Sequence, residues 1–309
     1  MTVDEAGEFG LVARLVARLG PAGAAVLGPG DDAAVVPAPD GRVVATTDLL
    51  VEGGHFRRDW SSAYDIGRKA VAQNLADIAA MGAVPTGLLV GLGCPADTAL
   101  AWVDELTDGL RDEAAEAGAA VVGGDVVRSA GVLLAVTALG DLQGRAPVTR
   151  SGARPGDVLA VCGRLGWAAA GLAVLGRGFR SPGRVVAAHR RPEPPYPQGP
   201  RAAMEGATAM IDVSDGLVQD VGHLAAASAV SIGLRRAGLE VPQVLVDVGA
   251  ALGVDPYDWL LTGGDDHALV ATFGGGVPDG WLVIGGVSAG EGVTVDGQPY
   301  GAGGHDHFG

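Results

Sequence analysis

The sequence has 309 residues, of which 48% are hydrophobic, and it carries a formal net charge of −15 at pH 7. This length and apolar content indicate one large or two ordinary domains with a sizeable core, and they argue against disorder. The acidic charge argues against sequence-independent binding to nucleic acid or to an anionic membrane, because both require a basic surface.

The first residues, MTVDEAGEFG, lack the basic and apolar segments of a secretory signal, and no run approaches the ~20 apolar residues of a membrane span. Only two cysteines are present, Cys94 and Cys162, each in apolar surroundings. They predict buried thiols in a reducing compartment rather than a disulfide or a zinc site. We therefore expect a cytoplasmic protein.

Charged residues are used unevenly along the chain. Of the 36 acidic residues 26 are aspartate, and Lys69 is the one lysine. Because Lys69 follows Arg68, the chain contains no GxxxxGK[ST] phosphate loop, and it contains no GxGxxG motif either. If the protein handles a nucleotide, it must hold the phosphates by other means.

The N-terminal part alternates predicted helices and strands. A long helix is expected from an N-cap at Asp65 to Met81, with Gly82 as the residue after its C-cap. The other elements expected here are a helix over 8–19, a strand near 42–47, a strand over 86–93, a helix over 97–117, a strand ending at 121–125 and a strand over 131–140. This order indicates a mixed α/β fold.

The pattern restarts after the turn-rich segment 145–157, which predicts an N-terminal domain over 1–144 and a C-terminal domain over 145–309. A single long loop inside one domain is the alternative. Expected next are a strand over 158–163, a helix over 167–176, a proline-rich loop over 190–200, a strand over 208–216 leading into a helix from Gly216, and a strand over 281–287. Both halves place aspartates at strand ends, so we expect the site in a cleft between them.

Two segments of the first half combine polar oxygens with apolar surroundings. Thr46, Thr47 and Asp48 end a β-like stretch, and His55 follows in a Gly-Gly loop; a hydroxyl-rich turn with a surface histidine is the alternative. Further on, Asp77 shares a helix face with Ala70, Asn74 and Met81 near the end where the helix dipole disfavours negative charge. An arginine or a capped backbone could compensate Asp77, but its recurrence with other lone aspartates favours a divalent cation.

Further aspartates follow predicted strands. Asp125 comes after two glycines, where the backbone can approach a ligand closely. Asp212 and Ser214 share a face if the chain is extended, whereas Asp215 can cap the next helix. Two carboxylates in proximity repel by ~1 kcal/mol in water and ~4 kcal/mol at an effective dielectric of 20. Mg²⁺ bridging to ATP phosphates would remove this repulsion, with Arg150 as a cationic phosphate contact or, alternatively, a salt-bridge partner.

Seven segments in order then resemble one family: GPGDDAAVV, TTDLLVEGGHF, IGRKAVAQNLADIAAMGA, VVGGDVVRS, VTRSGARPGD, IDVSDGL and LTGGDDHAL. The chain is similar to the thiamine-monophosphate kinases of the aminoimidazole ribonucleotide synthetase-like (PurM-like) ATP-binding superfamily. The resemblance implies an α/β (α+β) two-domain fold whose N-terminal mixed sheet dimerises and whose C-terminal α/β domain closes over the nucleotide. It also implies direct in-line transfer from ATP to thiamine monophosphate with several Mg²⁺ ions.

The resemblance further implies roles for individual residues. The catalytic carboxylates are Asp48, Asp77 and Asp212. The metal ligands are Asp32, Thr46, Thr47, Asp48, Asp77, Asp125, Asp212 and Asp215. The ATP contacts are Gly123, Gly124, Asp125, Arg150 and Ser214, and the substrate contacts are His55, Asp265 and His305. Asp31 is expected to brace the preceding Gly-Pro-Gly turn while Asp32 faces the metals, because successive side chains of a strand alternate.

The chain departs from the family pattern in one motif and in its tail. The usual GGEDYEL stands as GGDDHAL, so Asp265 replaces a longer carboxylate, and His267 and Ala268 replace Tyr and Glu. His305 stands where the tail usually has an aromatic ring. Two other functions remain open: another ATP-dependent synthetase of the superfamily, and a non-catalytic metal- or nucleotide-binding module.

Overall fold

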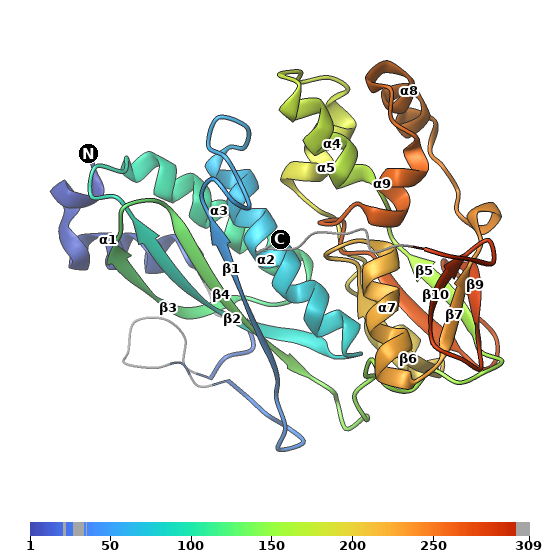
Figure 1. Cartoon of the computed structure of the whole chain (residues 1–309). Coiled ribbons are helices and arrows are strands. Elements are labelled where there is room, and N and C mark those ends of the chain that lie inside the picture. The colour runs from blue at the N-terminus through green and yellow to red at the C-terminus, as the bar shows by residue number, and fades with distance from the viewer. Residues whose placement is uncertain (21–22, 27–33, 35, 301–309) are drawn as a thin grey trace. The chain divides into compact units, whose positions relative to one another are not determined.

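The computed structural model describes residues 1–20, 23–26, 34 and 36–300, with the backbone alone for Glu8 and Phe9. The chain forms two compact units, Met1–Ile78 with Ala83–Arg145, and Ala79–Gly82 with Ala146–Gly309 (Figure 1). Each unit contains a sheet and several helices, which confirms the mixed α/β class.

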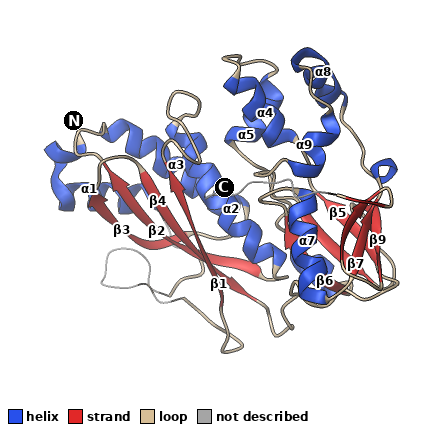
Figure 2. Ribbon diagram, in the orientation of Figure 1, coloured by secondary structure: helices blue, strands red, loops and turns tan. Residues whose placement is uncertain are grey.

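The first unit is built on a four-stranded sheet in the order β1-β4-β2-β3. Its strands are β1 (Val44–Val51), β2 (Val84–Cys94), β3 (Val121–Arg128) and β4 (Leu133–Asp141), and its helices are α1 (Val3–Leu19), α2 (Ala63–Ala80) and α3 (Leu100–Glu116). Only β2 and β3 pair in parallel; the other neighbours are antiparallel. Figure 2 shows α2 and α3 along one face of this sheet.

The two faces of this sheet differ in burial. Leu50, Val136 and Val90 are buried on the face towards the helices. On the opposite face, which we call the open face, apolar side chains remain exposed: Leu49 by 52%, Val51 by 44%, Leu89 by 40% and Val127 by 56%. Because successive side chains of a strand alternate, each candidate residue on these strands lies either on the face towards the helices or on the open face.

The helix and strand boundaries of the first unit correct two expectations. Asp65 does not cap α2; the Ser62 hydroxyl accepts from the Asp65 N–H at 3.1 Å, and the Asp65 carboxylate accepts from the Ser62 N–H at 3.2 Å, which is a capping box. Gly82 follows the helix with a φ of +71°, as predicted. The first strand covers 44–51 rather than 42–47 because it pairs with β4 throughout, so Asp48 lies inside it and not at its end.

The second unit contains a seven-stranded sheet in the order β11-β10-β7-β9-β5-β8-β6. Its strands are β5 (Val158–Cys162), β6 (Ala207–Asp212), β7 (Ser231–Leu234), β8 (Leu269–Phe273), β9 (Leu282–Ser288), β10 (Gly292–Val295) and β11 (Gln298–Pro299). Strand β8 is buried along its whole length, and Phe273 meets Trp281 edge to face with ring centroids 5.5 Å apart. The sheet core therefore lies around β8.

Helices of the second unit include several that the sequence did not predict. They are α4 (Trp167–Gly176), α5 (Gly183–Arg190), α6 (Gln198–Met204), α7 (Leu217–Ser228), α8 (Gln243–Leu252) and α9 (Pro256–Thr262), with a 3₁₀ turn at Arg236–Gly238. The predicted loop over 190–200 is wrong at its end, where α6 begins at Gln198. Its prolines precede the helix or lie in its first turn, where a missing N–H costs no hydrogen bond.

Both cysteines are buried free thiols, as predicted, and burial raises the pKa of each. Among the described residues, no helix combines the length and apolar character needed to cross a membrane.

Candidate functional site

In the first unit, strand β1 and helix α2 bring together Thr46, Asp48, Asn74 and Asp77. The Thr46 hydroxyl donates to Asp77 Oδ2 at 2.8 Å, and the Asp48 N–H donates to Asn74 Oδ1 at 3.0 Å. Asn74 is fully buried and donates its amide to the Ala70 carbonyl at 2.9 Å. The predicted helix face is thus the face that meets β1, and the strand supplies a polar partner of Asp77.

Thr47 and Asp125 are separated from that group by the sheet. Thr47 alternates with Thr46 and Asp48 and lies on the open face, where its hydroxyl donates to the Val136 carbonyl at 3.0 Å. Asp125 pairs with Gly91 on the same face, but β3 and β1 are the two edges of the sheet. Three strand spacings separate edges by ~14 Å, so Asp125 and Asp77 of one chain cannot share an ion.

The glycines before Asp125 have a structural reason within the sheet. A Cβ at Gly124 would lie 2.0 Å from the Val90 carbonyl oxygen, and one at Gly123 would lie 3.0 Å from Leu89 Cδ2. The close approach is therefore to the neighbouring strand β2. Whether these glycines also admit a ligand stays a prediction.

His55 lies in the turn after β1. The Val51 N–H donates to His55 Nδ1 at 3.1 Å. Because Nδ1 accepts, the neutral imidazole carries its proton on Nε2. The turn thus fixes the tautomer and the orientation of the ring.

In the second unit, two loops pair beside the end of β6. The Val213 N–H donates to the Ala268 carbonyl, the His267 N–H to the Val213 carbonyl, and the Asp265 N–H to the Ser214 carbonyl, at 2.8, 2.9 and 2.8 Å. Strand β6 ends at Asp212, so the expected shared face is wrong: Asp212 is buried and Ser214 is exposed. Paired backbones hold the two acidic motifs together.

His267 connects the acidic residues of these loops. Its Nδ1 lies 2.9 Å from Asp212 Oδ2, and its Nε2 lies 3.7 Å from Asp265 Oδ1. Burial lowers the pKa of His267, but the hydrogen bond with Asp212 and the charges of Asp212 and Asp265 outweigh it and raise the pKa to about 10. The ring is an imidazolium at neutral pH and balances charge on both carboxylates.

Asp220 is a site residue that the sequence did not reveal. Its carboxylate accepts from the N–H groups of Asp215 and Gly216 at 3.1 and 3.0 Å. Asp220 therefore binds the N–H groups of the two residues that precede α7. Asp215 does not cap this helix, because the N-cap residue is Gly216, which corrects the prediction. Burial and the nearby charge of Asp212 raise the pKa of Asp220 to about 7.

Asp266 accepts hydrogen bonds from backbone N–H groups at the start of helix α4. Its carboxylate accepts from the N–H groups of Gly166 and Ala168 at the start of that helix, the second at 2.8 Å. Burial raises the pKa of Asp266 to about 7 although these hydrogen bonds lower it. The GGDDH loop is thereby tied to α4 as well as to the loop after β6.

Other predicted residues lie apart or outside the described part of the chain. Arg150 has an exposed side chain, and its carbonyl accepts from the Ser228 hydroxyl at 2.9 Å. Asp31, Asp32 and His305 lie outside the described residues. Within the described ranges, no three His, Cys, Asp or Glu side chains gather as a metal centre by themselves.

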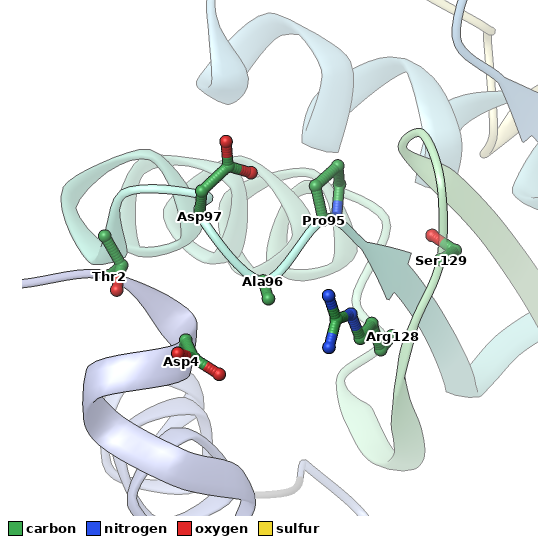
Figure 3. A pocket seen from close by; sticks show the side chains of 7 residues that line it. All are labelled: Thr2, Asp4, Pro95, Ala96, Asp97, Arg128 and Ser129. Atoms are coloured by element: carbon green, nitrogen blue, oxygen red, sulfur yellow. The ribbon is translucent and has the colours of Figure 1, made fainter.

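A pocket of about 400 Å³ lies elsewhere in the first unit (Figure 3). It is lined by Thr2, Asp4, Pro95, Ala96, Asp97, Arg128 and Ser129. In Figure 3 the Arg128 guanidinium extends into the space between Asp4 and the turn at Pro95–Asp97. None of the predicted site residues lines it.

Comparison with known proteins identifies the family. The thiamine-monophosphate kinase of Mycobacterium tuberculosis is 50% identical over 301 residues, which cover 97% of this chain and 90% of that protein. The chain belongs to the thiamine-monophosphate kinase family. The resemblance noted in the ordered motifs is confirmed.

Solved structures of the thiamine-monophosphate kinase family share the fold. The enzyme from Stenotrophomonas maltophilia K279a superposes with a TM-score of 0.83 at 32% identity, covering 94% of this chain and 96% of that one. AaThiL, complexed with AMPPCP and TMP, gives a TM-score of 0.80 at 30% identity over 100% of this chain and 99% of that one. In addition, residues 30–142 match the family described as AIR synthase related protein, N-terminal domain.

Proposed function

We propose that this chain transfers the γ-phosphoryl group of ATP to thiamine monophosphate and forms ADP and thiamine diphosphate. The observation that carries the proposal is the 50% identity to a thiamine-monophosphate kinase over 97% of the chain. A match of this extent disfavours the two alternatives, since neither another synthetase nor a binding module needs the full ordered set of kinase motifs.

The donor chemistry of the first unit fits Mg²⁺. Thr46, Asp48 and Asp77 offer only oxygen atoms, and the Thr46 hydroxyl already lies 2.8 Å from Asp77. Mg²⁺ prefers oxygen ligands, keeps several waters and completes its shell with substrate phosphates, so it does not require three protein carboxylates. We propose Asp48 and Asp77 here, and Asp212 and Asp215 in the second unit, as ligands. Bound Mg²⁺ would neutralise charge that develops on the transferred phosphoryl group.

The reaction requires little acid-base chemistry from the protein. An oxygen of the thiamine monophosphate phosphate attacks the γ-phosphorus, and the bond from that phosphorus to the β,γ-bridging oxygen breaks, which leaves ADP. The nucleophile is already ionised at neutral pH, so catalysis consists of positioning and charge stabilisation.

The remaining predicted contacts complete this proposal. Arg150, Ser214, Gly123, Gly124 and Asp125 are proposed to contact ATP, and His55 and Asp265 the substrate. Asp32 and Thr47 are proposed as metal ligands, Thr47 on the open face and therefore apart from an ion held by Asp48 and Asp77. His305 is proposed as a substrate contact. The domain limits 1–144 and 145–309 and a cytoplasmic location are part of the same proposal.

We also propose that the protein is a homodimer that pairs the open faces of two four-stranded sheets. The four exposed apolar side chains of that face, Leu49, Val51, Leu89 and Val127, lie on three strands of one sheet. Exposed apolar patches of this kind are typical of protein interfaces. Dimerisation would remove these side chains from water.

The proposed activity is tested with purified protein, ATP, Mg²⁺ and thiamine monophosphate, with products separated by chromatography. Thiamine diphosphate and ADP should appear in equal amounts, and unphosphorylated thiamine should not replace the substrate. Consumption of ATP without thiamine diphosphate would refute the assignment. A binding module would be recognised by stabilisation with Mg²⁺ alone, whereas the kinase should gain more from Mg²⁺ with nucleotide.

A further inference from the structure

The loop before β8 holds an unusual backbone conformation. Asp265 and His267 have φ angles of +69° and +53°, in the left-handed region that side-chain-bearing residues rarely adopt. Between them and α9, a Cβ on Gly264 would lie 2.2 Å from the Ser214 carbonyl oxygen, so the two loops touch at their backbones. Such conformations persist where the surroundings enforce them, and they concentrate at functional sites.

The buried imidazole of His267 is the side chain that this conformation places between two carboxylates. His267 and Asp212 are 5% and 4% exposed, and their side chains meet at 2.9 Å. On the other ring nitrogen, Asp265 Oδ1 lies at 3.7 Å, and Asp265 is also approached by His189 Nδ1 at 3.8 Å. One ring therefore spans a carboxylate proposed to hold metal and a carboxylate proposed to contact substrate.

We propose that His267 is a positioning residue that orients Asp212 through Nδ1 and Asp265 through Nε2, and so couples the metal side of the site to the acceptor side. This inference rests on the proposed function for the identity of the acceptor. Partners that orient a metal ligand commonly change metal affinity or activity by ~10–100-fold when they are removed. His267 is 5% exposed and its two ring nitrogens face Asp212 and Asp265, so its proposed effect passes through these two aspartates.

The two ring nitrogens can be separated by substitution. The amide nitrogen of Asn can occupy the place of Nδ1, so His267→Asn keeps a donor for Asp212 and loses the contact with Asp265. The longer amide of Gln can reach the place of Nε2, so His267→Gln has the opposite effect. Asn also tolerates the left-handed backbone at this position. His223→Asn is the control, because His223 is exposed on α7.

In steady-state kinetics, the Asn and Gln variants should change different constants. We expect His267→Asn to raise the KM for thiamine monophosphate about 10-fold with a half-saturating Mg²⁺ concentration close to wild type. His267→Gln should raise the half-saturating Mg²⁺ concentration about 10-fold and lower kcat, with a smaller change in that KM. His267→Ala should show both changes, and His223→Asn neither.

A second readout does not depend on turnover. The increase in melting temperature caused by Mg²⁺ with AMPPCP should be retained in His267→Asn and reduced in His267→Gln. If the wild type made no thiamine diphosphate, the proposed function would fail while this difference still supported the link to Asp212. Equal constants and equal melting shifts for the Asn and Gln variants would overturn the proposal, and so would a His267→Ala protein that matches wild type in both assays.

Discussion

At the scale of single residues, the candidate acidic side chains of each unit are held by specific donors. Asp77 accepts from the Thr46 hydroxyl, Asp212 lies against the His267 ring, and Asp220 accepts from two backbone N–H groups. These contacts reduce the repulsion and desolvation that would otherwise oppose gathering carboxylates in a fold. The residues are therefore oriented before any ligand binds.

Asp77→Asn should abolish most of the activity while the protein stays folded. The amide keeps the shape and can still accept from Thr46, but it lacks the charge that a Mg²⁺ ligand supplies. We expect kcat for thiamine diphosphate formation to fall by about 100-fold or more. Asp247→Asn, on the exposed side of α8, is the matched control and should leave kcat unchanged. Unchanged turnover in Asp77→Asn would remove Asp77 from the metal site.

Asp266 should make stability depend on pH. Its pKa in the folded protein is about 7, above the ordinary value of 3.8, so between these values the folded state holds a proton that the unfolded state releases. Stability therefore falls as pH rises from about 4 to about 7, by at most about 1.4 kcal/mol per pH unit. Asp266→Asn does not titrate, so the wild type should lose stability relative to this variant across that range. Urea unfolding at several pH values measures the free energy of unfolding of the wild type minus that of the variant. If this difference stays constant or rises with pH, the pKa of Asp266 is not raised.

At the scale of elements, neighbouring helices and strands determine which predicted residues meet. The face of α2 that carries Asn74 and Asp77 could be predicted from helical periodicity, and so could Gly82 after its end. Thr47 is separated from Asp77 because successive side chains of β1 alternate between the two faces of the sheet. The separation of Asp125 from Asp77 could not be predicted, because it follows from the non-sequential strand order β1-β4-β2-β3. Likewise, His267 meets Asp212 only because the loops after β6 and before β8, which lie far apart in the sequence, pair with each other.

An ion pair between α2 and α3 should contribute measurably to stability. The Arg68 guanidinium contacts the carboxylates of both Glu113 and Glu116, whose side chains are 3% and 60% exposed. Removing the buried partner leaves a poorly solvated cation, so Glu113→Gln should lower the free energy of unfolding by about 2 kcal/mol. Glu116→Gln should cost less than about 0.5 kcal/mol because water replaces its contact. Equal losses in urea unfolding would contradict the importance of burial here.

At the scale of the whole molecule, the open face of the first sheet should determine the oligomeric state. A chain of 30.8 kDa should sediment at twice that mass at micromolar concentration. Leu89→Asp places a charge on the open face and should give the monomer, because a buried unpaired carboxylate opposes association. Leu282→Asp is the control: Leu282 is 42% exposed, close to the 40% of Leu89, but lies on β9 in the other unit. A wild-type monomer, or a dimer that Leu89→Asp leaves intact, would contradict this interface.

If the chain transfers the γ-phosphoryl group of ATP directly to thiamine monophosphate, the fate of that group shows it. With ATP labelled at the γ-phosphorus, the label should appear in the terminal phosphate of thiamine diphosphate, with one ADP formed for each labelled product. Label recovered as inorganic phosphate, while thiamine monophosphate remains unchanged, would contradict direct transfer.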